Sequence, residues 1–329
     1  MIRRVILTIG LAITSSSLMA LTPPKNIKWV TAKNIPLIAS KNAQQGGSFY
    51  DYMPSFPLTL RDVGPDSNGS FRSNLDANKM SLVSMHPNTD EYIPSLATHW
   101  AIDKNNRTVY FKLDKAARWS DGKPVTGEDF LYTIEFMTSK HIVAPWYNEY
   151  FSKQIESVET TKLSDGSEVV AVTLPLAKPD IIYHANIAPT PKHFYGKIDK
   201  NFIKKFNWKI APTTGPYQIS EIKKGKKITF KKVKNWWAGD KEWFKNRFNI
   251  NKIVLKVIRD NNVAFEYLKK GKIDYMMINF PDYWHDKTKI PEFENGYIHK
   301  LQAYNEKPRS DYLMIMNNDK ELFQVYLFF

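Results

Sequence analysis

Cysteine is absent from all 329 residues of the chain. Its absence excludes disulfide bonds, thiolate metal sites and a cysteine nucleophile. It also argues against a lipoprotein anchor, which requires a cysteine directly after an export signal. If the chain is exported, we therefore expect it to be free in the periplasm and not tethered to a membrane by lipid.

Short signatures of catalysis and metal binding are also scarce. The seven histidines include no pair at a metal-ligand spacing such as i, i+4. The sequence has no Gly-x-Ser-x-Gly motif and no glycine loop of the kind that cradles a phosphate. Asp121 and Asp129 could be proposed as a carboxylate pair, but they stand in a turn and at a helix start, where structural roles account for them. We predict that the protein is not an enzyme and carries no cofactor or metal ion.

The first twenty residues have the three parts of a secretory signal peptide. Arg3 and Arg4 form the positive start, residues 5–13 the apolar segment, and residues 15–20 the small-residue exit. A membrane anchor is the alternative, but the apolar run is shorter than the ~20 residues that span a bilayer. No later segment is long and apolar enough to cross a membrane. We expect a cleavable signal at residues 1–20 and a periplasmic remainder long enough for two domains of roughly 150 residues.

The chain is strongly basic, with a formal net charge of +14. A basic surface can favour nucleic acids or anionic membranes. Here the lysines are scattered, and a local run at 223–234 fits the solvated face of a hairpin that turns at 224–226 before a strand at 228–233. We therefore expect no nucleic-acid partner.

Residues 96–137 hold the most ordered pattern in the chain. Three apolar residues at period two predict a half-buried strand: Val109, Phe111 and Leu113. Asp121-Gly122 then predicts a turn, and Thr126 with Asp129 forms a capping-box pair. Three apolar residues at helical spacing mark one face of a helix that ends near residue 139: Phe130, Ile134 and Met137.

Other elements follow from turn and cap residues. We predict a first strand opened by Gly46-Gly47, a long loop at 61–78 and an aromatic loop at 145–151. A hairpin is expected from segments 155–161 and 168–174. In the motif at 213–219, Gly215 can adopt a positive φ before the strand that starts at Tyr217. A strand at 253–258 should precede a helix at 261–270 that Gly271 ends.

Three of these segments, in this order, resemble the signature of the family 5 solute-binding proteins of ABC importers: residues 96–137, 213–219 and 264–276. Residues 261–271 and the aromatic loop are similar to the oligopeptide-binding, YejA-like subgroup. The resemblance implies a mixed α/β fold, a periplasmic binding protein type II-like lobe with an inserted small middle domain. The implied organisation is a first lobe at 21–72 and 190–305, a middle domain at 73–189, and the start of a second lobe at 306–329.

The C-terminal end departs from that family. Its members are usually much longer, and they continue after a strand like 311–317 into a second lobe. We expect that lobe to be largely missing here, so that the chain is truncated after the first lobe and middle domain. A genuinely short, single-lobe protein is the alternative.

The resemblance also implies which residues face a ligand: Ser55, Phe56, Tyr147, Tyr150, Asn279 and Phe280. Backbone hydrogen bonding to an extended peptide would supply affinity, and water-filled pockets would accept varied side chains. Packing against the middle domain is the alternative role for each aromatic residue.

The function implied is that of a monomeric periplasmic binding component that carries oligopeptides to the ABC permease subunits in the inner membrane. Two alternatives stay open: a secreted enzyme or adhesin built on the same lobe, and a binding protein for a non-peptide solute. Because most of the second lobe would be missing, we expect little high-affinity binding by this chain alone.

Overall fold

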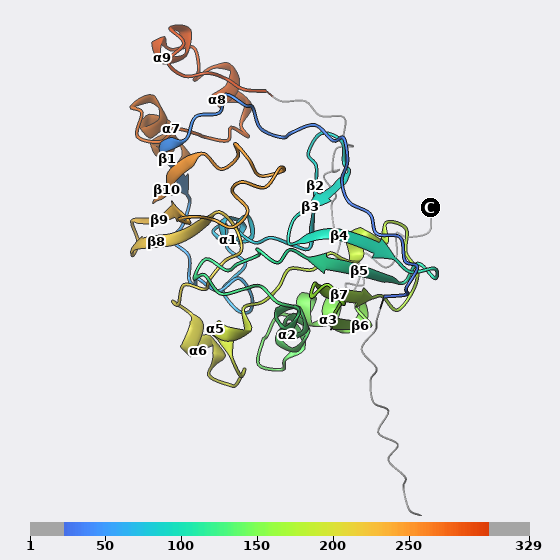
Figure 1. Ribbon diagram of the computed structural model, residues 1–329. Coiled ribbons are helices and arrows are strands. Elements are labelled where there is room, and N and C mark those ends of the chain that lie inside the picture. The colour runs from blue at the N-terminus through green and yellow to red at the C-terminus, as the bar shows by residue number, and fades with distance from the viewer. Residues whose placement is uncertain (1–22, 303–329) are drawn as a thin grey trace, which may run out of the picture. The chain divides into compact units, whose positions relative to one another are not determined.

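The computed structural model describes residues 23–302, which form two units that divide after Met276. The expected signal peptide at 1–20, the strand at 311–317 and the second-lobe segment at 306–329 lie outside the described residues. The first unit holds two four-stranded sheets and a two-stranded ladder (Figure 1). The described part of the second unit contains two short helices, α8 (Pro281–His285) and α9 (Pro291–Glu294).

One sheet joins the beginning of the chain to residues more than 160 positions later. Its strands, in spatial order, are β1 (Gly46–Met53), β10 (Ile250–Val257), β9 (Lys227–Lys232) and β8 (Tyr217–Lys223). β1 and β10 are parallel, and the other pairs are antiparallel. The predicted lysine-rich hairpin is confirmed as β8 and β9, with Gly225 in the turn at φ +69°. A core that includes Met53, Ile228 and Leu255 stabilises this sheet.

The other sheet is built entirely from the middle of the chain. Its strands, in order, are β4 (Ala97–Ile102), β5 (Thr108–Leu113), β7 (Glu168–Thr173) and β6 (Ser157–Lys162). The hairpin predicted around residue 165 is confirmed by the antiparallel pairing of β6 with β7. A separate ladder pairs β2 (Val83–Met85) with β3 (Tyr92–Pro94).

Strand β5 is buried on both faces, so the prediction of a half-buried strand was wrong. Val109, Phe111 and Leu113 lie in the main core, as expected. Tyr110, on the opposite face, is also buried, because Ile27 and Trp29 from the N-terminal segment pack over it. Alternation along one strand cannot reveal a covering segment that lies about eighty residues earlier in the chain.

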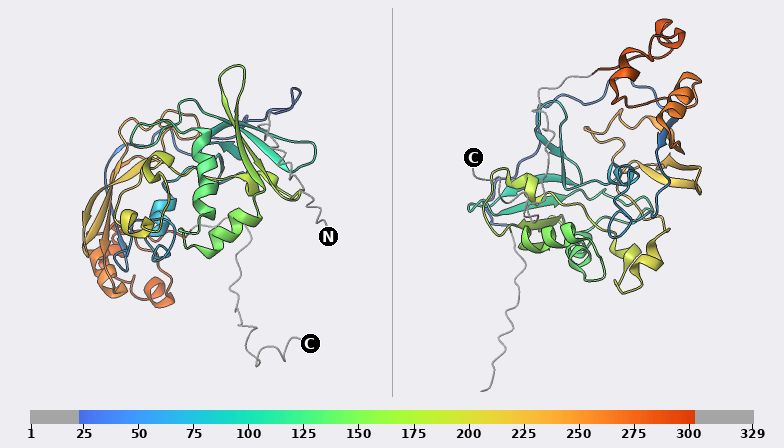
Figure 2. Two further views of the ribbon diagram at one scale, coloured as in Figure 1. Left: turned by 90° about the horizontal axis from the view of Figure 1, so that it is seen from below. Right: turned by 180° about the vertical axis from the view of Figure 1, so that it is seen from behind.

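The described part of the first unit also contains these helices: α1 (Arg72–Asp76), α2 (Gly127–Thr138), α3 (Pro145–Lys153), α4 (Ile181–Ala185), α5 (Lys192–Tyr195), α6 (Phe202–Phe206) and α7 (Asn261–Lys269). α2 packs against β6 and β7, and α3 lies beside α2 (Figures 1 and 2). Two segments predicted as loops, 61–78 and 145–151, contain helices. Pro145 at the first helical turn favours helix entry, so the aromatic stretch forms α3 and not a loop. The expected loop at 61–78 contains α1.

The residues of the signature at 96–137 have structural partners. The Asp129 side chain is 4% exposed and accepts hydrogen bonds from Thr126 N (3.1 Å), Trp119 Nε1 (3.2 Å) and Lys192 N (3.2 Å). Gly122 takes a φ of +87° in the predicted turn. Asp121 contacts His193 Nε2 at 2.8 Å. These contacts give both aspartates structural roles, as the sequence indicated.

Gly215 is needed for a close backbone approach, and the expected positive φ is not observed. A Cβ atom at this position would lie 2.2 Å from Asn78 O. The turn that contains Gly215 is bonded to the segment before β2, because Met80 N donates to Thr214 Oγ1 at 2.8 Å and Tyr217 N to Asn78 Oδ1 at 3.1 Å. The motif at 213–219 thus connects the start of β8 to the segment that leads into β2.

Candidate ligand-binding surface

Two hollows adjoin each other across the loop at residues 64–72. One, of about 260 Å³, lies between this loop and residues 55–61. The other, of about 560 Å³, lies between the loop and residues 143–147. Arg72 lines both hollows, so they form one continuous candidate surface.

A buried arginine holds the loop in place. Arg61 is 2% exposed and donates to Val63 O at 2.7 Å and to Pro65 O at 2.6 Å. Its guanidinium also lies 2.8 Å from the position that a Cβ on Gly64 would occupy. The chain can therefore turn tightly around Arg61 before it passes between the two hollows.

Arg72 connects α1 to α3 across the surface. Its Nη2 donates to the Tyr147 hydroxyl, and its guanidinium carbon lies 4.9 Å from the centre of the Tyr147 ring. Nε donates to Asp76 Oδ2 at 3.0 Å. Burial acts to lower the pKa of Arg72, but Asp76, together with Tyr147 and Asp62, outweighs this effect, so the pKa lies above its ordinary value. The surface therefore carries at its centre a fixed guanidinium whose positive charge is balanced by Asp76.

Three of the six predicted ligand residues come together around this loop. Ser55, which is exposed, and Phe56, which is partly buried, line the first hollow, and Tyr147 lines the second. Phe56 stacks on Trp208 with ring centres 5.9 Å apart. Tyr150 lies outside both hollows, where its ring stacks on Trp146 and its hydroxyl lies 3.4 Å from His184 O. The geometry of Tyr150 fits the packing alternative.

Asn279 and Phe280 belong to the second unit. Both are exposed, and Phe280 precedes α8 with its ring 5.8 Å from that of Tyr283. Their role in ligand binding stays a prediction.

Sequence reasoning missed the exposed apolar side chains and the arginine of this surface. Leu58 and Trp146 are 67% and 66% exposed, and each lines one hollow. A helix predicted at 145–153 would have placed Trp146 beside Tyr150, because residues four positions apart share a helix face. The sequence contains no comparable sign that Arg72 reaches Tyr147.

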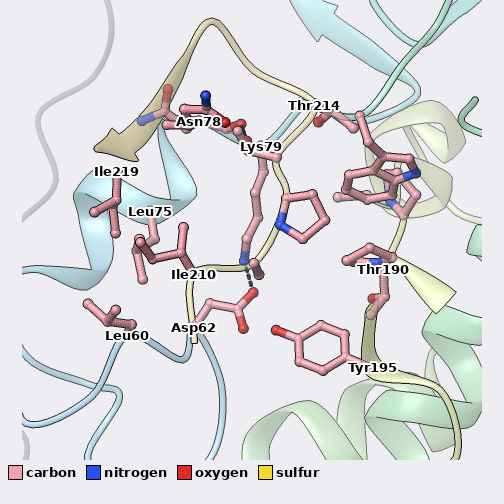
Figure 3. Close-up of a pocket in the computed structure, with 18 of the residues that line it drawn as sticks. Leu60, Asp62, Leu75, Asn78, Lys79, Thr190, Tyr195, Ile210, Thr214 and Ile219 are labelled. Carbon is pink, nitrogen blue, oxygen red and sulfur yellow. Dashed lines mark hydrogen bonds and ion pairs between the residues drawn. The ribbon is translucent and has the colours of Figure 1, made fainter. Parts of the chain in front are cut away.

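A third cavity, of about 110 Å³, lies between strands β8 and β9 and the helices α1, α2 and α5 (Figure 3). Leu60, Leu75 and Ile210 form part of its apolar wall, and Asp62 and Lys79 form an ion pair at its polar end. Burial would raise the pKa of Asp62, but Lys79 holds this pKa below its ordinary value. The Tyr195 hydroxyl points toward Asp62, and burial raises the Tyr195 pKa well above normal.

Metal-binding clusters and membrane-spanning helices would mark other classes of protein. Within residues 23–302, no cluster of three or more His, Asp or Glu side chains is arranged to hold a metal ion. No helix in the same range has both the length and the apolar character needed to cross a membrane.

Known proteins match this chain over most of its length. A Brucella melitensis biotype 1 protein named as a binding protein is 26% identical over 274 residues, covering 81% of this chain and 43% of that protein. The uncharacterized protein YejA of Escherichia coli K12 is 25% identical over 239 residues, covering 70% and 37%. The oligopeptide-binding protein AppA from Bacillus subtilis, solved with a nonapeptide, matches with a TM-score of 0.60 at 22% identity, covering 76% and 47%.

The chain thus spans less than half the length of each of these proteins. The matches confirm the expected mixed α/β fold of a periplasmic binding protein and the resemblance to YejA. The family model described as bacterial extracellular solute-binding proteins, family 5 Middle, matches residues 91–325. Because this match covers well over half of the chain, the chain belongs to the family 5 bacterial extracellular solute-binding proteins.

Proposed function

We propose that the protein is the periplasmic solute-binding component of an ABC importer and that it binds oligopeptides. The observation that carries the proposal is the gathering of Ser55, Phe56 and Tyr147 around two connected hollows directly after strand β1. Ligands of α/β proteins commonly bind beyond the carboxyl ends of the strands, where Ser55 and Phe56 lie. The nonapeptide held by AppA supports a peptide as the ligand class.

In the proposed binding mode, an extended peptide lies along residues 55–58 and crosses Arg72 toward Tyr147. Main-chain hydrogen bonds would supply most of the affinity, and the two hollows would receive peptide side chains. Their volumes, about 260 and 560 Å³, exceed those of single side chains, so water can fill the remaining space. Exposed Leu58 and Trp146 would favour peptides that carry apolar side chains.

The proposed domain organisation follows the two sheets. Strands β1, β8, β9 and β10 come from residues assigned to the first lobe, 21–72 and 190–305. Strands β2 to β7 come from residues 73–189, the proposed middle domain. In the complete importer, closure of two lobes on the peptide would signal loading to the permease subunits, with the binding protein acting as a monomer.

The test is a titration of the purified chain from residue 21 with a pool of nonapeptides, followed by tryptophan fluorescence. Trp146 lines the second hollow and Trp208 stacks on Phe56, so binding should change the emission of one or both. We expect weak, saturable binding, because the chain spans less than half the length of the relatives it matches.

Matched variants locate the site. Phe56→Ala and Tyr147→Ala should each weaken binding by about tenfold, as for loss of a buried aromatic contact. Tyr183→Ala removes an aromatic side chain that is 64% exposed and does not line either hollow, so it should leave the affinity unchanged. Equal affinities in all three variants would refute this site, and saturable binding of an oligosaccharide in place of peptide would refute the ligand class.

A further inference from the structure

A polar hollow of about 360 Å³ lies beside the segment that joins β9 to β10. Three cationic side chains line it, those of Lys232, Lys234 and Arg247, against the single acidic side chain of Asp240. Other lining residues carry amide groups that can donate hydrogen bonds: Gln45, Asn235 and Asn251. The hollow therefore has an excess of positive charge and several neutral donors.

Arg247 is partly buried, yet no carboxylate of residues 23–302 forms an ion pair with it. Its guanidinium lies 4.8 Å from the ring centre of Phe248 and 5.4 Å from that of Phe244. Its Nη1 donates to Trp243 O at 3.2 Å. By contrast, Arg72 pairs with Asp76, and Arg107 pairs with Glu156.

Burial lowers the pKa of Arg247, and no acidic side chain in the described part of the chain offsets this effect. A guanidinium has five N–H donors and stays charged in proteins, so several of its donors are left for a ligand. A half-buried cation is costly unless it is paired, and within residues 23–302 the Arg247 guanidinium meets two aromatic rings and one carbonyl but no carboxylate, so it can accept an anionic partner.

The backbone holds Arg247 in a defined position. Its two neighbours both take left-handed conformations, Asn246 at φ +60° and Phe248 at φ +54°. Asn235, across the same hollow, has φ +53°. A left-handed Phe is unusual, and such conformations gather at sites that bind ligands.

This hollow is separate from the candidate peptide surface. Gln45 directly precedes β1, and Asn251 stands at the start of β10, so the hollow lies at the amino-terminal ends of these parallel strands. Ser55 and Phe56 follow the other end of β1. At about 3.3 Å per residue, the eight residues of β1 place the two sites about 25 Å apart.

We propose that the hollow around Arg247 binds a phosphate group, either free phosphate or a phosphate ester. The planar guanidinium can donate two parallel hydrogen bonds to phosphate oxygens. Lys232 and Lys234 add two ammonium groups whose charge matches a dianion. The site is independent of peptide binding, so it stands or falls separately from the transport proposal.

The experiment is calorimetry of the full chain with inorganic phosphate, with sodium chloride at matched ionic strength as the blank. We expect saturable binding with a Kd of about 0.1–1 mM. A parallel titration with glycerol 2-phosphate distinguishes free phosphate from a phosphate ester as the ligand. A site for esters should bind glycerol 2-phosphate at least as tightly as inorganic phosphate, and a site for the free ion should bind it more weakly. No saturable heat with either ligand at about 10 mM would overturn the proposal.

Two sets of variants assign the binding to this hollow. The double variant Lys232→Gln/Lys234→Gln should weaken phosphate binding by at least about tenfold. Lys224→Gln/Lys226→Gln makes the same change in charge at the β8–β9 turn and should leave the Kd unchanged. Equal losses in both double variants would show that net charge alone attracts phosphate, and would overturn the site.

Arg247→Gln should abolish saturable binding. Because Arg247 packs on two phenylalanine rings, its replacement could disturb the fold. The circular dichroism spectrum of the variant must therefore match that of the unmodified chain. If this variant fails to fold, the lysine pair still decides the proposal.

Discussion

Gly215→Ala should destabilise the first unit strongly, because the new methyl group has no space. It would meet three backbone atoms of Asn78, with O at 2.2 Å, C at 2.7 Å and Cα at 2.8 Å. Ordinary contact requires about 3.4 Å or more, so the two segments must separate by about 1 Å. Backbone atoms cannot move aside as the end of a flexible side chain can.

The expected loss follows from two effects. Overpacking in a close contact costs about 1–3 kcal/mol. Separation also weakens the hydrogen bonds from Thr213 Oγ1 to Asn78 O and from Tyr217 N to Asn78 Oδ1, at about 1 kcal/mol each. Alanine restricts the unfolded chain and returns about 0.4–1 kcal/mol. The net fall in the free energy of unfolding is about 3 kcal/mol.

Urea unfolding followed by tryptophan fluorescence measures this loss. The indole groups of Trp236 and Trp237 both donate to Thr214 O, so the emission reports on the turn itself. Gly69→Ala is the control, because Gly69 has an ordinary φ and no atom within 4 Å of the added methyl group. If the two variants differ by less than about 1 kcal/mol, close approach is not the reason for glycine at position 215.

The remaining predictions concern two aspartates, Asp129 at the start of α2 and Asp62 in the third cavity. Asp129→Ala leaves three donors without an acceptor, among them the buried Trp119 indole, and should lower the free energy of unfolding in urea by about 2–4 kcal/mol. A loss below about 1 kcal/mol would contradict the structural role of Asp129. Asp62→Asn should lower the unfolding free energy at pH 7 by about 1 kcal/mol, since Lys79 holds the Asp62 pKa below its ordinary value. That contribution to stability is present above the unfolded pKa of about 3.9 and is lost as the pH falls through the lower folded pKa. The thermal melts of variant and parent should therefore converge only in strong acid. A constant difference at every pH would refute the assignment.

Local sequence patterns were sufficient for the hairpins and for the ends of α2 and α7. The β8–β9 hairpin follows from the lysine run around the glycine turn at 224–226, and the α7 helix ends where Gly271 takes φ +60°. Thr126 and Asp129 start α2 through neighbouring backbone groups. Each of these features depends on residues within a few positions of one another, which is why one sequence predicts them.

Features that depend on distant segments were not predictable in this way. Position 215 requires glycine because the backbone of Asn78 passes beside it, and β5 is buried on both faces because Trp29 packs over one of them. The candidate site shows the same limit. Ser55, Phe56 and Tyr147 were found through family resemblance, but the arginine between them acquires its position only when α1 meets α3.

The pairing of β1 with β10 sets the order in which the chain can assemble. Gly46 pairs with Ile250, so about 200 residues must be available before the first strand gains a partner. The sheet of β4 to β7 closes within residues 97–173 and can form much earlier. Contacts so distant in sequence slow folding, and until they form, β1 remains open to pairing with other chains. A chain of this topology would therefore depend most on protection by chaperones during the interval between completion of its nested sheet and arrival of β10.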